Sequence, residues 1–156
     1  MSGEGVLVGI IDTGINYLDP IFRNLDGSTR IQRIWDQEEQ SGTAPRGIGY
    51  GSEYTKEQIN QAILSENPKE TVPSFDTDGH GTFVASVACG GANPENLFIG
   101  AAPEAEMVIV KLKEAKEYLR EYYFVDRDAR CYQENDNDAF YLPRCHFRSQ
   151  SRLNGE

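Results

Sequence analysis

The sequence of 156 residues lacks any hydrophobic run long enough to cross a bilayer, and it is short of basic residues, cysteine and histidine. Lys and Arg number 15 against 25 Asp and Glu, which gives a formal net charge of -10. A phosphate backbone attracts basic surfaces, so this balance argues against a nucleic-acid partner. Residues 1–4 also lack the basic and apolar regions of a signal peptide. We therefore expect a soluble chain with no membrane span.

Three cysteines are too few for a disulfide scaffold, and the metal-ligating residues follow no usual pattern. Cys89 lies in an apolar segment and is most simply a small buried residue. Cys131, Cys145 and His146 have none of the common zinc-ligand spacings. Asp-Thr-Asp-Gly at residues 76–79 begins like a calcium loop, but the further ligands are missing at the required distances. The sequence thus predicts no cofactor and no metal site.

The composition indicates a globular chain that is not disordered in its bulk, since 38% of the residues are hydrophobic and 26% are charged. Residues 5–11 form a continuous apolar run rich in β-branched residues, which predicts a strand covered on both faces. Further elements are expected as follows: a helical turn from Pro20, a strand at 30–36, a surface loop at 37–51, a helix from a capping box at Thr55 and Gln58 to before Asn67, and an amphipathic helix at 111–125.

Residues 78–91 predict a short helix buried along one face. Asp78 is an acceptable N-cap, and Gly90 with Gly91 would supply the left-handed positions at which helices stop. His80 is therefore expected in the first turn. The apolar face is expected to contain residues that recur at three- and four-residue spacing, namely Phe83, Val84, Val87 and Ala88.

Asp12 and His80 are the candidate functional residues. Asp12 ends the first apolar strand, and the carboxyl ends of parallel strands are where α/β proteins place functional groups. Each residue also has a plain structural interpretation. Asp12 could bond its own backbone in a turn, and His80 could be a partly buried histidine at the start of its helix.

The motifs around Asp12 and His80 together indicate a protein family much more specifically than either residue does alone. Asp-Thr-Gly-Ile at residues 12–15, followed by Gly-His-Gly-Thr-x-Val-Ala at residues 79–85, resembles the subtilisin-like serine proteases, the subtilases. The Gly-x-Ala-Pro turn at residues 100–103 is similar to the same family. The resemblance implies a three-layer α/β fold with a mainly parallel sheet, of which this chain is the N-terminal part. It also implies peptide-bond hydrolysis through an Asp-His-Ser triad, in which Asp12 orients His80 and His80 takes a proton from serine.

The resemblance implies two regions in the chain. Residues 1–125 are expected to be the N-terminal part of a catalytic domain, with an insertion at about 23–75. Within it, residues 50–55 and 111–120 are similar to subtilases of spore-forming anaerobic bacteria, a group that includes germination proteases. Residues 126–156 are an atypical tail, for which we expect a change of reading frame near residues 133–138; an ordinary disordered terminus is the alternative.

No serine in the sequence stands in the family's Gly-Thr-Ser-x-x-x-Pro setting, and no oxyanion donor can be assigned by motif. We therefore expect a fragment that is inactive alone, with a polypeptide substrate and the remainder of the catalytic domain as partners. The family is mostly secreted and can hold structural calcium, but no calcium site is assigned here. Two other classes stay open, a non-catalytic binding or regulatory remnant and a metal-dependent hydrolase built on Asp78 and His80.

Overall fold

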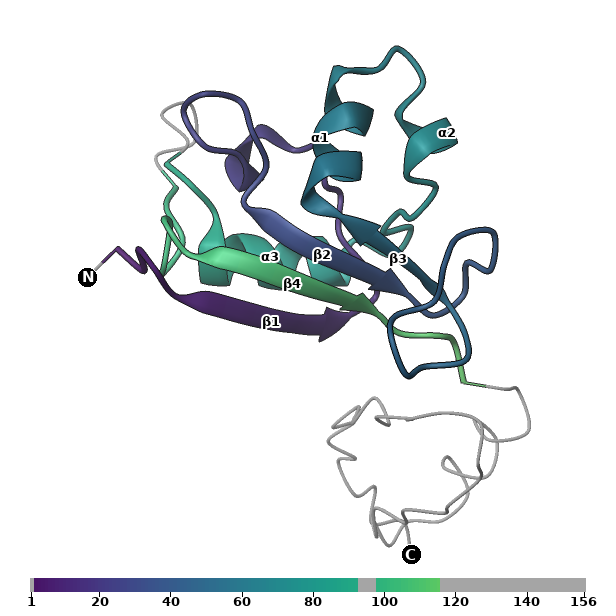
Figure 1. Cartoon of the computed structure of the whole chain (residues 1–156). Helices are drawn as coiled ribbons and strands as arrows, with labels where there is room; N and C mark the ends of the chain where they lie inside the picture. The colour runs from purple at the N-terminus through teal and green to yellow at the C-terminus, as the bar shows by residue number, and fades with distance from the viewer. Residues whose placement is uncertain (1, 93–97, 116–156) are drawn as a thin grey trace, which may run out of the picture. The chain divides into compact units, whose positions relative to one another are not determined.

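A four-stranded mixed sheet forms the centre of the fold (Figure 1). The computed structural model describes residues 2–92 and 98–115. In chain order the elements are β1 (Leu7–Asp12), the 3-10 helix η1 (Pro20–Phe22), β2 (Ile31–Asp36), β3 (Ser52–Thr55), α1 (Lys56–Leu64), α2 (Pro68–Thr71), α3 (His80–Cys89) and β4 (Glu106–Lys111). The strand order is β1-β4-β2-β3, in which β4 pairs in parallel with β1 and β2, and β3 pairs antiparallel with β2. The predicted α/β class is confirmed.

One face of the sheet carries the hydrophobic core. A buried row crosses all four strands in register and consists of Ile10, Ile109, Ile34 and Tyr54. Ile59 and Ala62 of α1, and Ala85 and Cys89 of α3, belong to the same buried cluster. Helices α1 and α3 therefore cover the same side of the sheet, and the burial predicted for Cys89 is confirmed.

The opposite side of β1 is open within the described residues. Leu7 and Ile11 are both more than half exposed, and Ile11 is in register with Val110, which is in register with Trp35. We call these four residues the open face. The prediction that the first strand is covered on both faces is wrong for the described part of the chain, because the helices that pack on the sheet lie on one side and β1 is an edge strand.

Helix α3 buries only part of the face that the apolar spacing predicted, since Val84 and Ala88 are partly buried against the core whereas Phe83 and Val87 are exposed. Its buried residues are Gly81, Ala85 and Cys89, whereas Phe83 is 65% exposed and Val87 is 47% exposed. The reason is distance, since a Cβ atom added at Gly81 would lie 2.2 Å from the carbonyl oxygen of Gly14. No side chain fits at Gly81, so the first turn of α3 can pack closely on the end of β1.

The C-terminal end of α3 is capped by the Gly-x-Ala-Pro turn. The amide groups of Ala101 and Ala102 donate to the carbonyl oxygens of Val87 and Ala88, at 3.0 and 2.8 Å. These carbonyls would otherwise have no partner within the helix. Gly90 follows the helix as predicted, but its φ is -59°, so the left-handed ending predicted there is wrong.

Most of the other predicted elements are confirmed, with one exception. The turn at Pro20, the strand ending at Asp36, the loop at 37–51 and the Thr55 capping box are all present. The helix predicted at 111–125 is wrong at its start, because Lys111 ends β4 and residues 112–115 are not helical; its remainder and the tail lie outside the described residues. None of the described helices has the length and apolar character that a bilayer span needs.

Replacing Gly81 by alanine should lower the free energy of unfolding by about 2 kcal/mol, because the added methyl group forces α3 away from Gly14. Urea unfolding followed by the fluorescence of Trp35, the only tryptophan, measures this. Gly9→Ala is the matched control, since a Cβ there has no neighbour within 4 Å. Equal midpoints for the two variants would contradict the close-packing explanation.

Candidate functional site

Asp12 and His80 lie together at the carboxyl end of β1. Asp12 is the last residue of β1 and His80 is the first residue of α3. The Nδ1 atom of His80 is 2.8 Å from Oδ1 of Asp12, within hydrogen-bond distance. The imidazole is 60% exposed and the carboxylate is 18% exposed. The pair therefore presents a free edge of the histidine ring to solvent while the carboxylate is mostly covered.

The Asp12 carboxylate is also held by its own strand end. The backbone N–H of Thr13 donates to the same oxygen, Oδ1, at 2.7 Å. This is the turn-forming bond that the structural interpretation of Asp12 expected, and it coexists with the contact to His80. A carboxylate oxygen has two lone pairs, so both bonds can form together.

The start of α3 is organised by Asp76, for which the sequence had suggested only the beginning of a calcium loop. The N-cap position is Gly79, with a φ of 88° that favours glycine, so the prediction of Asp78 as N-cap is wrong. The Asp76 carboxylate accepts from the amide groups of Gly79 and Thr82, at 2.9 and 2.8 Å. It thereby satisfies donors that a helix N-terminus leaves unpaired. An acidic residue four positions before His80 was the available signal.

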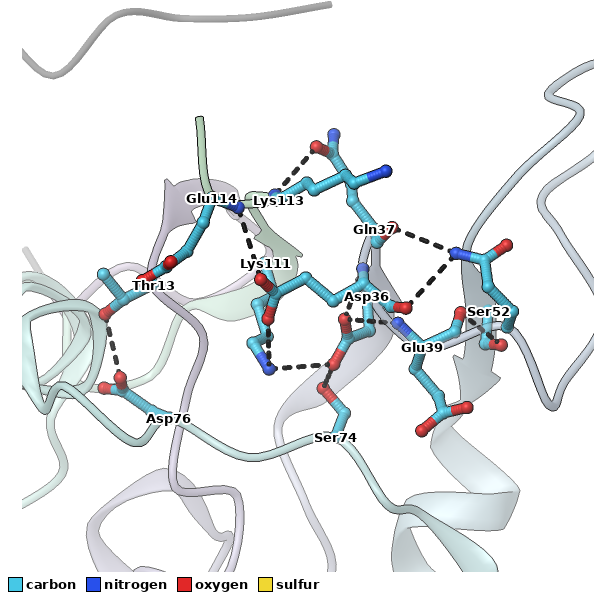
Figure 2. Close-up of polar contacts among 12 residues, drawn as sticks. Thr13, Asp36, Gln37, Glu39, Ser52, Ser74, Asp76, Lys111, Lys113 and Glu114 are labelled. Atoms are coloured by element: carbon cyan, nitrogen blue, oxygen red, sulfur yellow. Dashed lines mark hydrogen bonds and ion pairs between the residues drawn. The ribbon is translucent and has the colours of Figure 1, made fainter. Parts of the chain in front are cut away.

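The Thr13 hydroxyl joins this cap to the strand end. It donates to Oδ1 of Asp76 at 2.8 Å, as Figure 2 shows, and accepts from the amide of Gly81 at 2.9 Å. The Thr82 hydroxyl donates to Oδ2 of Asp76 at 2.6 Å. Burial raises the pKa of the Asp76 carboxyl, but the hydrogen bonds from Thr82, Gly79 and Thr13 outweigh burial and hold this pKa below its ordinary range.

A second polar cluster lies beside the pair at the same edge of the sheet. Asp12, Lys111 and Asp36 stand abreast in register at the carboxyl ends of β1, β4 and β2. The Nζ atom of Lys111 lies 3.4 Å from Asp36 and 3.2 Å from Glu38, and the Ser74 hydroxyl donates to Asp36 at 2.7 Å (Figure 2). The Asp36 side chain is 1% exposed. Charged residues that end three neighbouring strands were a signal that the sequence contained.

Four serine hydroxyls of the described residues form hydrogen bonds away from His80. Each donates to a partner away from the imidazole: Ser28 to Asp26, Ser52 to the Glu39 carbonyl, Ser74 to Asp36 and Ser86 to the Phe83 carbonyl. Ser86 lies inside α3, as expected. The described residues bring Asp12 and His80 together, as the sequence predicted, and place these four serine hydroxyls on other partners.

The metal interpretations gain no support from the described residues. Both oxygens of Asp76 are occupied by hydrogen bonds from Thr13, Gly79 and Thr82, so this carboxylate is engaged as a helix cap. No group of three acidic, histidine or cysteine side chains in the described residues is arranged to hold a metal ion. Cys131, Cys145 and His146 lie outside the described residues.

Comparisons with known proteins agree with the motifs. The subtilase family matches residues 3–129. Subtilisin-like protease SBT2.2 of Arabidopsis thaliana is 33% identical over 98 residues, covering 57% of this chain and 11% of that protein. Subtilisin-like protease SBT1.9 of the same plant is 30% identical over 126 residues, covering 70% of this chain and 16% of that protein.

A solved structure shows the same likeness in three dimensions. The CspB protease of Clostridium perfringens matches with a TM-score of 0.62 and 40% sequence identity, covering 73% of this chain and 22% of that one. The predicted similarity to subtilases of spore-forming anaerobes thus has a clostridial counterpart. The chain spans only 11% to 22% of the length of these relatives. With the family match over most of its length, the chain belongs to the subtilase family of serine proteases, and its described fold is the N-terminal part of a subtilisin-like fold.

Proposed function

We propose that this chain supplies the acid and base of a subtilisin-class serine endopeptidase, with Asp12 and His80 as two members of an Asp-His-Ser triad. The observation that carries the proposal is the 2.8 Å contact between Nδ1 of His80 and Oδ1 of Asp12, made by residues 68 positions apart in the sequence. The subtilase match supports it, because that family hydrolyses peptide bonds in this way.

In this mechanism Nε2 of His80 removes the proton from a serine hydroxyl as that oxygen attacks the peptide carbonyl. The same nitrogen then returns the proton to the leaving amine. Asp12 keeps the other ring nitrogen protonated and stabilises the imidazolium that forms. The contact at Nδ1 leaves Nε2 for the serine, and the 60% exposure of the ring leaves room for one to approach.

The nucleophile in this proposal comes from polypeptide outside the 156 residues, because no serine in the sequence has the family setting. The remainder of a catalytic domain is therefore the proposed partner, and a polypeptide the proposed substrate. The open face supports this partner, since Leu7 and Ile11 expose apolar surface on an edge strand. Covering such an edge removes unpaired strand groups and apolar area from water.

A non-catalytic binding or regulatory remnant is the second candidate. The observation that favours it is the lack of the serine motif, because a remnant needs no nucleophile. It would retain the surface around Asp12 and His80 without chemistry there.

Reaction with a fluorophosphonate probe, which modifies activated serines, distinguishes the two candidates. We expect no labelling of the 156-residue chain. We expect labelling of a chimera in which residues 1–114 are joined to the part of the C. perfringens CspB protease that lies C-terminal to the matched segment. A folded chimera that stays unlabelled would support the remnant and contradict the protease.

A further inference from the structure

Asp76 is linked to both halves of the Asp12 and His80 pair without touching either. Its Oδ1 accepts from the hydroxyl of Thr13, the residue after Asp12, and from the amide of Gly79, the residue before His80. Its Oδ2 accepts from the amide and the hydroxyl of Thr82, at 2.8 and 2.6 Å. One carboxylate therefore ties the end of β1 to the first turn of α3.

The direction of the Thr13 hydroxyl depends on the charge of Asp76. An ionised carboxylate only accepts, so the hydroxyl must donate to it and keeps a lone pair for the amide of Gly81, at 2.9 Å. The amide of Thr13 meanwhile donates to Asp12 Oδ1, the oxygen that contacts His80. Hydrogen bonds thus hold Thr13 at both its hydroxyl and its amide. Thr13 directly follows Asp12, and its hydroxyl bonds to Gly81, which directly follows His80.

From this arrangement we propose that Asp76 is a positioning residue, which holds Asp12 and His80 at hydrogen-bond distance through Thr13 and the first turn of α3. The inference rests on the proposed function, because a catalytic triad needs Asp12 and His80 to be at hydrogen-bond distance before the substrate binds. The lowered pKa of Asp76 agrees with a carboxylate that is ionised at neutral pH.

A merely structural cap would change stability alone, so the test reads the histidine ring itself. Nitrogen-15 NMR of the 156-residue chain gives the ratio of the Nδ1–H to the Nε2–H tautomer. His80 and His146 are the only histidines, and a His80→Asn variant assigns the signals. The parent should favour Nδ1–H, because Asp12 accepts at that nitrogen.

In Asp76→Asn the ratio should fall about fivefold, the change expected when one hydrogen bond no longer holds the pair. Asp26→Asn is the matched control, because Asp26 also accepts from a hydroxyl and an amide, those of Ser28, in an exposed turn. Its ratio should equal that of the parent.

Two variants of Thr13 separate positioning from folding. Thr13→Ser keeps the hydroxyl and should keep the parent ratio, whereas Thr13→Val should lower the ratio as Asp76→Asn does. The proposal is overturned if folded Asp76→Asn keeps the parent ratio, if the parent has no Nδ1–H preference, or if both Asp76→Asn and Thr13→Val unfold while Thr13→Ser does not. Failure of the chimera to react with the fluorophosphonate probe would instead count against the proposed function, so the two failures are distinct.

Discussion

Replacing His80 by alanine in the labelled chimera is expected to lower kcat for peptide hydrolysis by about 10⁶-fold, the size of loss found when a subtilisin loses its triad histidine. Without the imidazole nothing removes the proton from serine as it attacks. Asp12→Asn should cost about 10⁴-fold, because the amide group can donate to the ring and favour the wrong tautomer, and it carries no charge to stabilise the imidazolium. The double variant should be little worse than His80→Ala, since residues that act as one unit are not additive.

The control for this series is Asp26→Asn in the same chimera, which changes a carboxylate in a remote exposed turn. Its kcat should match that of the parent chimera. Steady-state hydrolysis of a chromogenic peptide measures every variant, and circular dichroism confirms that each is folded. A His80→Ala chimera that keeps more than about a hundredth of the parent kcat would exclude His80 as the general base, because acid–base catalysis contributes at least that factor.

Asp36→Asn is expected to lower the free energy of unfolding of the chain by roughly 2 kcal/mol, because it neutralises a carboxylate that is 1% exposed and leaves Glu38, 3.2 Å from Lys111, as the remaining counter-charge of that lysine. The side chain of Asp36 also accepts from the amides of Glu38 and Glu39, and from the hydroxyl of Ser74. Urea unfolding followed by Trp35 fluorescence measures the loss. Asp26→Asn, which changes an exposed carboxylate, should leave the urea midpoint close to that of the parent.

The pH dependence of this difference gives a second check. Burial lowers the pKa of Lys111, but the carboxylates of Asp36 and Glu38 raise it by more, so it lies above its ordinary value of 10.5. A cation with a raised pKa stabilises the fold fully below the ordinary value and loses that contribution as the pH rises through the folded value. The gap in stability between parent and Asp36→Asn should therefore be constant from neutral pH to about 10.5 and narrow above it. If the difference in the free energy of unfolding between parent and Asp36→Asn did not change above pH 10.5, the stabilisation by Asp36 would not come from its ion pair with Lys111.

The Asp12 and His80 pair was predicted from the resemblance of two short motifs to the subtilases, because each residue read alone also had a plain structural interpretation. A strand that ends in Asp-Thr-Gly and a helix that opens with Gly-His-Gly-Thr are each defined within a few residues. The parallel arrangement then brings such ends to one edge of the sheet. The structure has both elements in these places, with a bond distance of 2.8 Å between the side chains. Their catalytic role stays a prediction.

The residues that sequence reasoning missed depend on tertiary contacts. Asp76 has meaning only once Thr13, 63 positions away, is beside it, and Lys111 pairs with Asp36 only because β4 enters the sheet next to β2. The predicted buried face of α3 was wrong for Phe83 and Val87, although Val84 and Ala88 do pack against the core. Hydrophobic spacing assumes that larger apolar residues face the core, whereas the approach of Gly81 to Gly14 admits no side chain.

The central position of β4 in the sheet delays the parallel pairing of β1 and of β2 while the chain is being synthesised. β4 is the last strand of the described sheet to leave the ribosome, yet both β1 and β2 take their parallel partner from it. Until residue 111 has emerged, β1 lacks its partner in the described sheet, and the nascent chain must keep the apolar residues of β1 from misassociating over about a hundred residues of synthesis. Pairing across about a hundred positions also makes the closing step slow relative to local helix formation. When the unfolded chain is allowed to refold, α1 should therefore form well before the amides of β1 become protected from hydrogen exchange.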